Sequence, residues 1–213
     1  REIAQAYLQN ITIVANKEEL NESQKRQAVQ ASISNAVNAA KLATDKNPKN
    51  VANWSLKGSI YQNLIGMVGG TKDWAVEAFE KATELEPVSP IHPTQAGISI
   101  LTHVGTLKED QKEEKAELLS EAEVFFNKAI DLKADYAPAL FQLSRVYLAQ
   151  GKEDQMISQL EKAKEAAPFD VGLAFQLGLV YYNKEEYSKA KSELERAVML
   201  NPDYANALYF LGL

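Results

Sequence analysis

The chain of 213 residues contains no cysteine, which excludes disulfides, thiol catalysis and zinc sites with cysteine ligands within it. Glycine and proline are scarce, with ten and seven copies, so the composition is not that of a low-complexity or collagen-like chain. The sequence also lacks any apolar run of about eighteen residues or more. We therefore predict no direct membrane insertion by this segment.

An excess of positive charge is lacking as well. Lys and Arg total 23 against 29 Asp and Glu, which gives a net charge of −6. Nucleic acids and anionic membrane surfaces are bound mainly by clustered Lys and Arg, so we predict no nucleic-acid partner. Charges of both signs are interspersed along stretches such as 184–196, and this pattern predicts solvated helix faces.

What the sequence does contain is a period of 34 residues. Leu177-Gly178 recurs as Leu211-Gly212, and one period earlier the matching pair is Leu143-Ser144. Further positions recur at the same interval: Tyr147 as Tyr181, Leu160 as Leu194, Ala163 as Ala197, and Pro168 as Pro202. A period shared by so many positions indicates one helical unit stacked on copies of itself.

The unit from 171 to 204 gives the period a physical explanation. Apolar residues spaced by three and four positions predict one helix in 171–184 and a second in 185–201. Small residues at Gly178 and Ala190 allow these two helices to approach closely, and Ala197 leaves room for the next repeat. Asn201-Pro202 ends the second helix, because proline disfavours the α conformation in the residue before it.

The stretch 54–87 carries the fullest set of marker residues: Trp54, Gly58, Tyr61, Ala75, Phe79, Ala82 and Pro87. This pattern resembles the tetratricopeptide repeat family, whose unit is a helix–turn–helix of the same period. The resemblance implies an all-α, right-handed superhelical solenoid of antiparallel helix pairs, forming a single domain over 1–213. The predicted repeats, about five and a half in number, are 1–49, 50–88, 89–136, 137–170 and 171–204, with a half repeat at 205–213.

Two repeats depart from the regular spacing. The second has five extra residues around 64–72, where we expect a loop or a helix extension. The third has thirteen extra residues between Gly97 and Ala122, which predicts a helix lengthened at its N-terminal end. In the first repeat, Asn21 followed by Gln24 resembles a capping box, so a long helix is expected to start there.

The residues predicted to pack one helix or repeat against the next share small or bulky apolar side chains, or end a helix. They are Trp54, Gly58, Tyr61, Ala75, Phe79, Ala82, Pro87, Gly97, Ala122, Phe126, Ala129, Leu143, Tyr147, Leu160, Ala163, Pro168, Leu177, Gly178, Tyr181, Ala190, Leu194, Ala197 and Pro202.

No catalytic, cofactor-binding or metal site is predicted. His92 and His103 are the only histidines, and along a helix they would lie about 16 Å apart, too far to share a metal ion. A surface or capping role is expected for both. The stretch 66–72 lacks the residue order of a phosphate loop, and adjacent acids such as Glu185-Glu186 are typical of a solvated helix. We therefore predict that the chain is not an enzyme.

In the resembled family, the first helix of each pair lines a concave surface that binds peptides. The matching positions form the predicted groove: Ser55, Ser59, Gln62, Thr94, Ile98, Leu101, Phe141, Arg145, Leu148, Phe175, Leu179, Tyr182 and Tyr209. Phe141, Phe175 and Tyr209 recur at 34-residue steps and form an aromatic ladder, suited to an amphipathic or hydrophobic peptide. The alternative is that this ladder packs repeat on repeat. Because Arg145 is the only basic groove residue, the carboxylate clamp of the chaperone-tail-binding branch is not expected.

The predicted function is that of a protein–protein interaction scaffold whose concave groove binds a peptide or protein segment. One alternative is homo-oligomerisation through the last helix, which leaves Leu208, Leu211 and Leu213 uncovered. A second alternative follows from a resemblance to repeat tails of bacterial membrane polysaccharide polymerases or ligases. The chain starts at Arg1 and stops within a repeat, so we expect it to be a segment of a longer protein. Under the second alternative, that longer protein would be anchored in a membrane. The sequence assigns no compartment.

Overall fold

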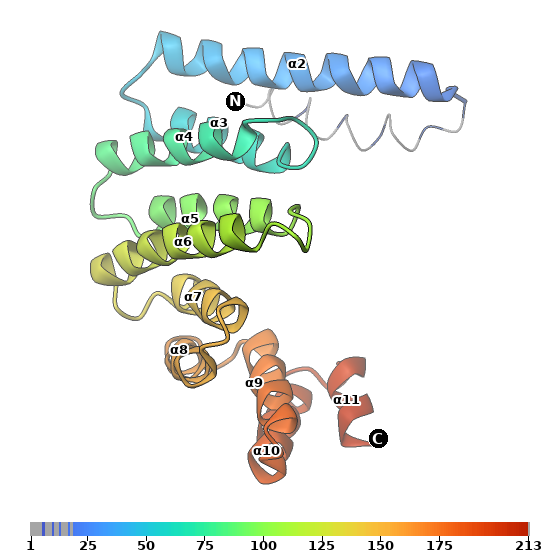
Figure 1. The fold of residues 1–213 in the computed structure, drawn as a ribbon, viewed down its shortest axis with the longest axis vertical. Coiled ribbons are helices and arrows are strands. Elements are labelled where there is room, and N and C mark those ends of the chain that lie inside the picture. Colours follow the sequence, from blue (N-terminus) through green and yellow to red (C-terminus); the bar gives the residue numbers. More distant parts are fainter. Residues whose placement is uncertain (1–5, 7–9, 11–12, 14–16, 18, 213) are drawn as a thin grey trace. The chain divides into compact units, whose positions relative to one another are not determined.

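The computed structural model describes residues 6, 10, 13, 17 and 19–212, and every regular element within them is an α-helix (Figure 1). The helices are α2 (Glu22–Lys46), α3 (Val51–Asn63), α4 (Thr71–Leu85), α5 (Ile91–Val104), α6 (Lys112–Leu132), α7 (Ala137–Ala149), α8 (Glu153–Ala166), α9 (Val171–Asn183), α10 (Tyr187–Leu200) and α11 (Ala205–Leu211). The prediction of an all-α chain of adjacent helix pairs is confirmed. The first helix of the first predicted repeat falls mostly outside the described residues.

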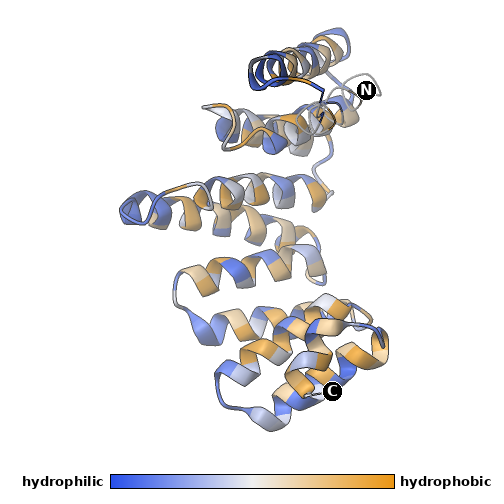
Figure 2. Cartoon of the chain, turned by 90° about the vertical axis from the view of Figure 1, so that its right-hand side faces the viewer, coloured by the Kyte–Doolittle hydropathy of each residue, from blue (hydrophilic) through white to orange (hydrophobic). Residues whose placement is uncertain are grey.

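The chain divides into two compact units, Arg1–Glu121 and Ala122–Leu213. In the first unit, α2 packs on α3, α3 on α4, and α4 on α5; α3 and α5 also touch each other. In the second unit, α7 packs on α8, α8 on α9, α9 on α10, and α10 on α11. Orange and blue residues alternate along individual helices in Figure 2, as expected where one face of a helix is buried and the other is solvated.

The departures from the regular spacing take the forms that the sequence predicts. The Oδ1 atom of Asn21 accepts a hydrogen bond from the Gln24 amide, and the Asn21 amide donates to Gln24 Oε1, both at 3.0 Å. This capping box starts α2, which is 25 residues long. Helix α6 has 21 residues and contains the insertion of the third repeat. The extra residues of the second repeat form the loop between α3 and α4, where Gly66 and Gly70 have positive φ angles of 84° and 77°.

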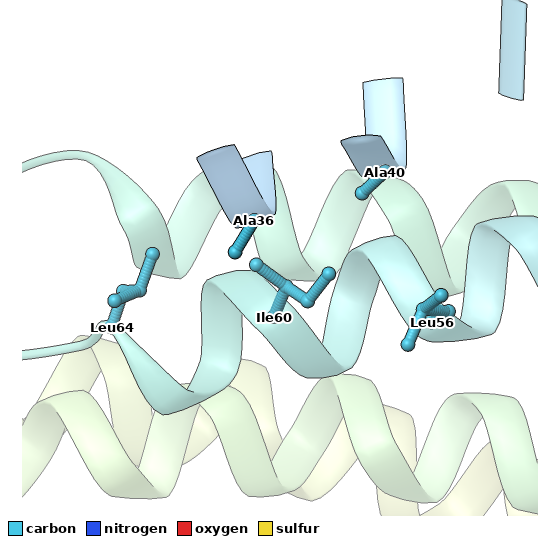
Figure 3. Packing of buried hydrophobic residues seen from close by; sticks show 5 residues of the cluster. All are labelled: Ala36, Ala40, Leu56, Ile60 and Leu64. Carbon is cyan, nitrogen blue, oxygen red and sulfur yellow. The ribbon is translucent and has the colours of Figure 1, made fainter. Parts of the chain in front are cut away.

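Alanines of α2 pack against large side chains of α3 in the core of the first unit. Figure 3 shows Ala36 and Ala40 directed toward Leu56, Ile60 and Leu64, and all five side chains are buried. Full burial of a leucine or isoleucine side chain contributes about 1.5–3 kcal/mol to stability. The small alanine side chains let α2 lie close to α3, so the larger residues fill the space between the helices.

Glycines mark the closest helix contacts in both units. A Cβ atom added to Gly58 would lie 2.8 Å from the ring of Phe79, and one added to Gly178 would lie 2.8 Å from the Leu194 side chain. The helix that carries each glycine therefore contacts its partner helix through its own backbone. In the second unit this contact belongs to a core that contains Ala174, Phe175, Leu194, Ala197 and Ala207.

A charged network ties the repeats of the second unit together. Glu193 on α10 is only 6% exposed. It accepts hydrogen bonds from Lys164 Nζ at 2.6 Å and Arg196 Nε at 2.8 Å. Arg196 Nη1 donates in turn to the carbonyl oxygen of Pro168 at 2.9 Å. The prediction that 184–196 presents only solvated charges is therefore wrong at Glu193, because two cations compensate the burial of its carboxylate.

Tyr181 joins the same network from α9. Its hydroxyl donates to Glu161 Oε1 at 2.6 Å, and Glu161 also accepts from Lys164 Nζ at 3.2 Å. Burial, and then the hydrogen bond to the Glu161 carboxylate, raise the pKa of Tyr181 far above its usual value. The Tyr181 hydroxyl therefore remains protonated, and a hydrogen-bond donor, over the whole physiological pH range. It links α9 to α8 through a hydrogen bond to a charged acceptor.

Candidate functional site

Four predicted groove positions of the first unit are polar (Ser55, Ser59, Gln62 and Thr94), and two of them, Ser55 and Gln62, form hydrogen bonds between helices. Ser55 Oγ lies 3.2 Å from Nδ1 of His92, which links α3 to α5. Gln62 Nε2 donates to the Gln95 carbonyl at 3.1 Å and to Ser99 Oγ at 3.0 Å, which links the same two helices again. Ser59 Oγ donates within α3 itself, to the carbonyl oxygen of Ser55. These polar groups hold the unit together and leave few free groups for a ligand.

His92 differs from its predicted surface or capping role. Both histidines lie on α5 as expected, but His92 is buried, with 5% of the residue exposed. Its Nε2 atom is 2.7 Å from Glu86 Oε2, while Nδ1 faces Ser55 on α3. The first turn of α5 faces α3, so the His92 side chain is buried between these helices and hydrogen-bonds across them. His103, at the other end of α5, is partly exposed, and among the described residues its side chain hydrogen-bonds only to Thr106.

An apolar pocket of about 490 Å³ lies between α7 and α9 in the second unit. It is lined by Ala137, Pro138, Phe141, Gln142, Ala167, Asp170, Gly172, Leu173, Gln176 and Tyr204. A second recess of about 360 Å³ shares Gln176 and extends toward the C-terminal ends of both helices. Its lining is Leu148, Gly151, Glu153, Met156, Gln176, Leu179, Val180 and Asn183. We call the two together the α7–α9 groove.

The 34-residue period places equivalent residues on the two helices that flank this groove. Phe141 and Gln142 on α7 correspond to Phe175 and Gln176 on α9, one period apart on helices of 13 residues each. The Asp170 carboxylate caps α9 by accepting from the Leu173 amide at 3.0 Å. Gln142 Oε1 accepts a hydrogen bond from Arg145 Nη1 at 2.9 Å, and this contact orients its amide.

The residues of the predicted aromatic ladder have three different environments. Phe175 is 8% exposed, and its ring lies 5.3 Å from that of Tyr204 and 6.1 Å from that of Phe210. Phe141 is partly buried and lines the pocket, whereas Tyr209 is 79% exposed. Phe175 therefore packs repeat on repeat, and only Phe141 combines partial exposure with a pocket.

Other predicted groove residues are placed as follows. Leu148 and Leu179 line the second recess, and Arg145 is exposed on α7. Tyr182 is exposed and packs edge-on against Phe210, with 5.5 Å between ring centroids. Ile98 is partly buried on α5.

Sequence reasoning missed the two glutamines, Gln142 and Gln176, although their 34-residue separation was a usable signal. It also missed Tyr204, which precedes α11 and lines the pocket from outside the first helices. Among the described residues no cluster of three metal-ligating side chains occurs. In the same part of the chain, no helix is both long and apolar enough to cross a membrane.

Helix pairs that repeat at 34 residues, with small residues at the contacts, define the class of helical-repeat proteins. The tetratricopeptide repeat family model matches residues 137–170 and again residues 172–204. The chain therefore contains two tetratricopeptide repeats, at residues 137–170 and 172–204. This fold is typically a non-catalytic scaffold for protein interactions.

Solved structures share the fold. The crystal structure of MamA is 20% identical, with a TM-score of 0.61 over 87% of this chain and 98% of that one. TTC0263, a thermophilic TPR protein of Thermus thermophilus, is 14% identical, with a TM-score of 0.64 over 97% and 96%. YrrB, described as a TPR protein with an unusual peptide-binding site, is 19% identical, with a TM-score of 0.56 over 95% and 98%. A comparison with curated protein sequences finds no match.

Proposed function

We propose that this chain is a protein-interaction scaffold that binds a peptide segment in the α7–α9 groove. The observation that carries the proposal is the pocket of about 490 Å³ beside Phe141, in a unit whose helices are otherwise well packed. Recesses of several hundred Å³, mostly apolar with a few polar groups, are typical of ligand sites. The volume is enough for one or two apolar side chains.

The polar groups of the groove suit a peptide main chain. Gln176 is exposed where the two recesses meet, and its side chain makes no hydrogen bond within the described residues. A carboxamide can both donate and accept, so Gln176 can pair with a peptide N–H and a peptide C=O. Gln142 lies one period earlier and offers its remaining amide hydrogens. Apolar recesses on either side of such amides favour a peptide with alternating apolar anchors.

The rigidity of the groove supports the same proposal. Its walls are helices held by buried leucines and by the network around Glu193, so binding orders the peptide but not the scaffold. The likeness of the fold to YrrB, whose description includes a peptide-binding site, is a second line of support.

A displayed random-peptide library, selected on the full 213-residue chain, tests the proposal. Fluorescence anisotropy then gives the dissociation constant of the enriched peptides. We expect Phe141→Ala to weaken binding about tenfold or more, because it removes the apolar wall. Gln176→Ala changes an exposed residue and should weaken binding about fivefold without lowering the melting temperature.

Met199→Ala is the matched control, because Met199 is 74% exposed on α10 and lies outside the groove lining. It should leave both binding and stability unchanged. Selected peptides that bind Phe141→Ala and Gln176→Ala as tightly as the unmodified chain would place the site elsewhere and reject the groove.

A second candidate function, self-association, is favoured by the exposed aromatics of α11. Tyr209 and Phe210 are 79% and 38% exposed, and their rings lie edge-on at 5.6 Å. Aromatic side chains of this kind are enriched at protein interfaces. Light scattering over a range of protein concentrations tests this function. A constant monomer mass would reject it, and a rise in mass that Tyr209→Ser abolishes would support it.

A further inference from the structure

The charges of the α7–α9 groove carry information about its ligand. We infer that the bound peptide is cationic, with Lys or Arg flanking its apolar anchor on both sides. This inference rests on the proposed function, because it concerns the same groove. It goes further by assigning the chemical class of the partner.

Carboxylates mark both ends of the groove. Asp170 lies beside Gly172 at the N-terminal end of α9, and Glu153 lies in the second recess with Leu148 and Asn183. The two pocket linings include no Lys or Arg. A peptide whose apolar side chains fill the recesses therefore brings its flanking residues toward one carboxylate at each end.

The neighbouring lysines do not neutralise these carboxylates. Lys152 pairs with Glu123 at 3.6 Å, and Lys184 pairs with Asp154 at 3.4 Å. Among the described residues, neither Glu153 nor Asp170 takes part in an ion pair. Asp170 uses Oδ1 as the cap of α9, which leaves Oδ2 for a ligand. The two lysines near the groove are thus paired with acids outside its lining, while Glu153 and Asp170 have no basic partner among the described residues.

Arg145 also lies beside the groove, and unlike Lys152 and Lys184 it forms no ion pair among the described residues. It lies on α7 between the pocket residue Gln142 and the recess residue Leu148, and its Nη1 atom is bonded to Gln142. Its charge repels a cationic ligand, whereas Glu153 and Asp170 attract one. Removing charges of opposite sign must therefore shift affinity in opposite directions, a result that general loss of packing cannot imitate.

The test uses three fluorescein-labelled peptides with the same Leu-Phe-Leu centre, flanked on both sides by Lys, Gln or Glu. Binding to the full chain is measured by anisotropy at low salt, about 0.01 M, and again at about 1 M, where charges are screened over a few ångströms. We expect the Lys-flanked peptide to bind most tightly and the Glu-flanked peptide least tightly. The difference should largely vanish at high salt.

Single substitutions assign the effect to the groove. Glu153→Gln and Asp170→Asn should each weaken the Lys-flanked peptide about two- to fivefold, as for partly exposed ion pairs. Asparagine caps a helix as well as aspartate does, so Asp170→Asn retains the start of α9. Arg145→Gln should strengthen the same peptide by a similar factor. Glu195→Gln, on the exposed part of α10, should change nothing.

The outcomes separate this inference from the proposed function. Equal binding of the three peptides, or preference for the Glu-flanked one, would contradict the inference of a cationic ligand. It would not contradict the proposal that the α7–α9 groove binds a peptide. The cationic ligand is also overturned if peptides selected from the random library bind the groove but show no excess of Lys or Arg. If no peptide from either source is weakened by Phe141→Ala, the groove itself fails, and the inference fails with it.

Discussion

The two compact units are built from the same kind of helix pair but use the corresponding helix faces differently. In the first unit, Ser55 and Gln62 of α3 reach across to His92 and Ser99 of α5. In the second unit, α7 and α9 are separated by an apolar pocket, and Gln176 lines it without a partner in the described chain. One face is closed by its own hydrogen bonds, whereas the other is open to a ligand.

The difference lies in side-chain chemistry and not in the backbone. Short polar side chains and one imidazole at the α3–α5 contact satisfy one another, so binding a ligand there would require breaking existing hydrogen bonds. Phe141, Pro138 and Leu173 cannot form such bonds, and water held against them is displaced at little cost by an apolar ligand. The comparison teaches that a repeat scaffold selects its binding face by a few side chains.

Loss of a core side chain should affect both units strongly and equally. Phe79 and Leu194 are each almost fully buried against a glycine of the partner helix. We expect Phe79→Ala to lower the free energy of unfolding by about 3–5 kcal/mol and Leu194→Ala by about 2–5 kcal/mol. Urea denaturation measures both. The exposed Met199→Ala serves as control, and a core variant as stable as this control would contradict the assigned packing.

Loss of the imidazole at position 92 should affect the first unit alone. His92→Leu removes the contacts to Ser55 and Glu86 and should destabilise the protein by about 1–3 kcal/mol, while peptide affinity in the α7–α9 groove stays unchanged. Denaturation and anisotropy on the same variant measure the two effects. His103→Leu, at the exposed end of α5, is the matched control. Weaker peptide binding by His92→Leu would show that the two faces are not independent.

Loss of the Tyr181 hydroxyl should affect the second unit and depend on pH. Tyr181→Phe removes the bond to Glu161 and should cost about 1 kcal/mol at neutral pH. The pKa of Tyr181 is raised in the folded state, so its contribution is complete below pH of about 10 and declines as the pH rises above that value. The stability of the unmodified protein should thus fall toward that of the variant in alkali.

Urea denaturation at pH of about 8 and about 11 measures this convergence. Tyr187→Phe is the control, because that ring is 58% exposed. A difference between Tyr181→Phe and the unmodified chain that stays constant up to the higher pH would contradict the assigned hydrogen bond.

Loss of a surface ion pair should affect neither unit measurably. Lys191 and Glu195 lie one helical turn apart on α10, 3.7 Å from each other, with both side chains more than half exposed. We expect Lys191→Ala to change the free energy of unfolding by about 0.5 kcal/mol or less. Thermal denaturation at two salt concentrations measures it, and a larger loss would mean that this face of α10 is covered.

Most of the fold follows from the sequence because it depends on local rules. The capping box at Asn21, the lengthened α6 and the loop around Gly70 all arise from residues close together in the chain. The site was harder to predict, because it depends on which long side chains meet across helices. Phe175 and Tyr209 share a register with Phe141, yet one is buried by Tyr204 and the other is exposed. Periodicity alone cannot separate these environments.

Buried charges were the other failure of sequence reasoning. Glu193 stands in a stretch where acids and bases alternate, a pattern typical of solvated helices. Only the three-dimensional approach of Lys164 and Arg196 makes its burial tolerable. Glu193 and its partner Lys164 are 29 residues apart in the sequence, so no short motif could reveal that they form an ion pair.

The Lys164–Glu193 bond also sets an order of events during synthesis of the chain. Glu193 is made 29 residues after Lys164, which at about 5–20 residues per second corresponds to a delay of about 1.5–6 s. Until then α8 lacks the carboxylate of α10, and Pro168 lacks the guanidinium of Arg196. For seconds, therefore, the growing chain exposes Lys164 and the Pro168 carbonyl without their partners. The repeat from 137 to 170 completes its contacts only after the repeat from 171 to 204 has been made.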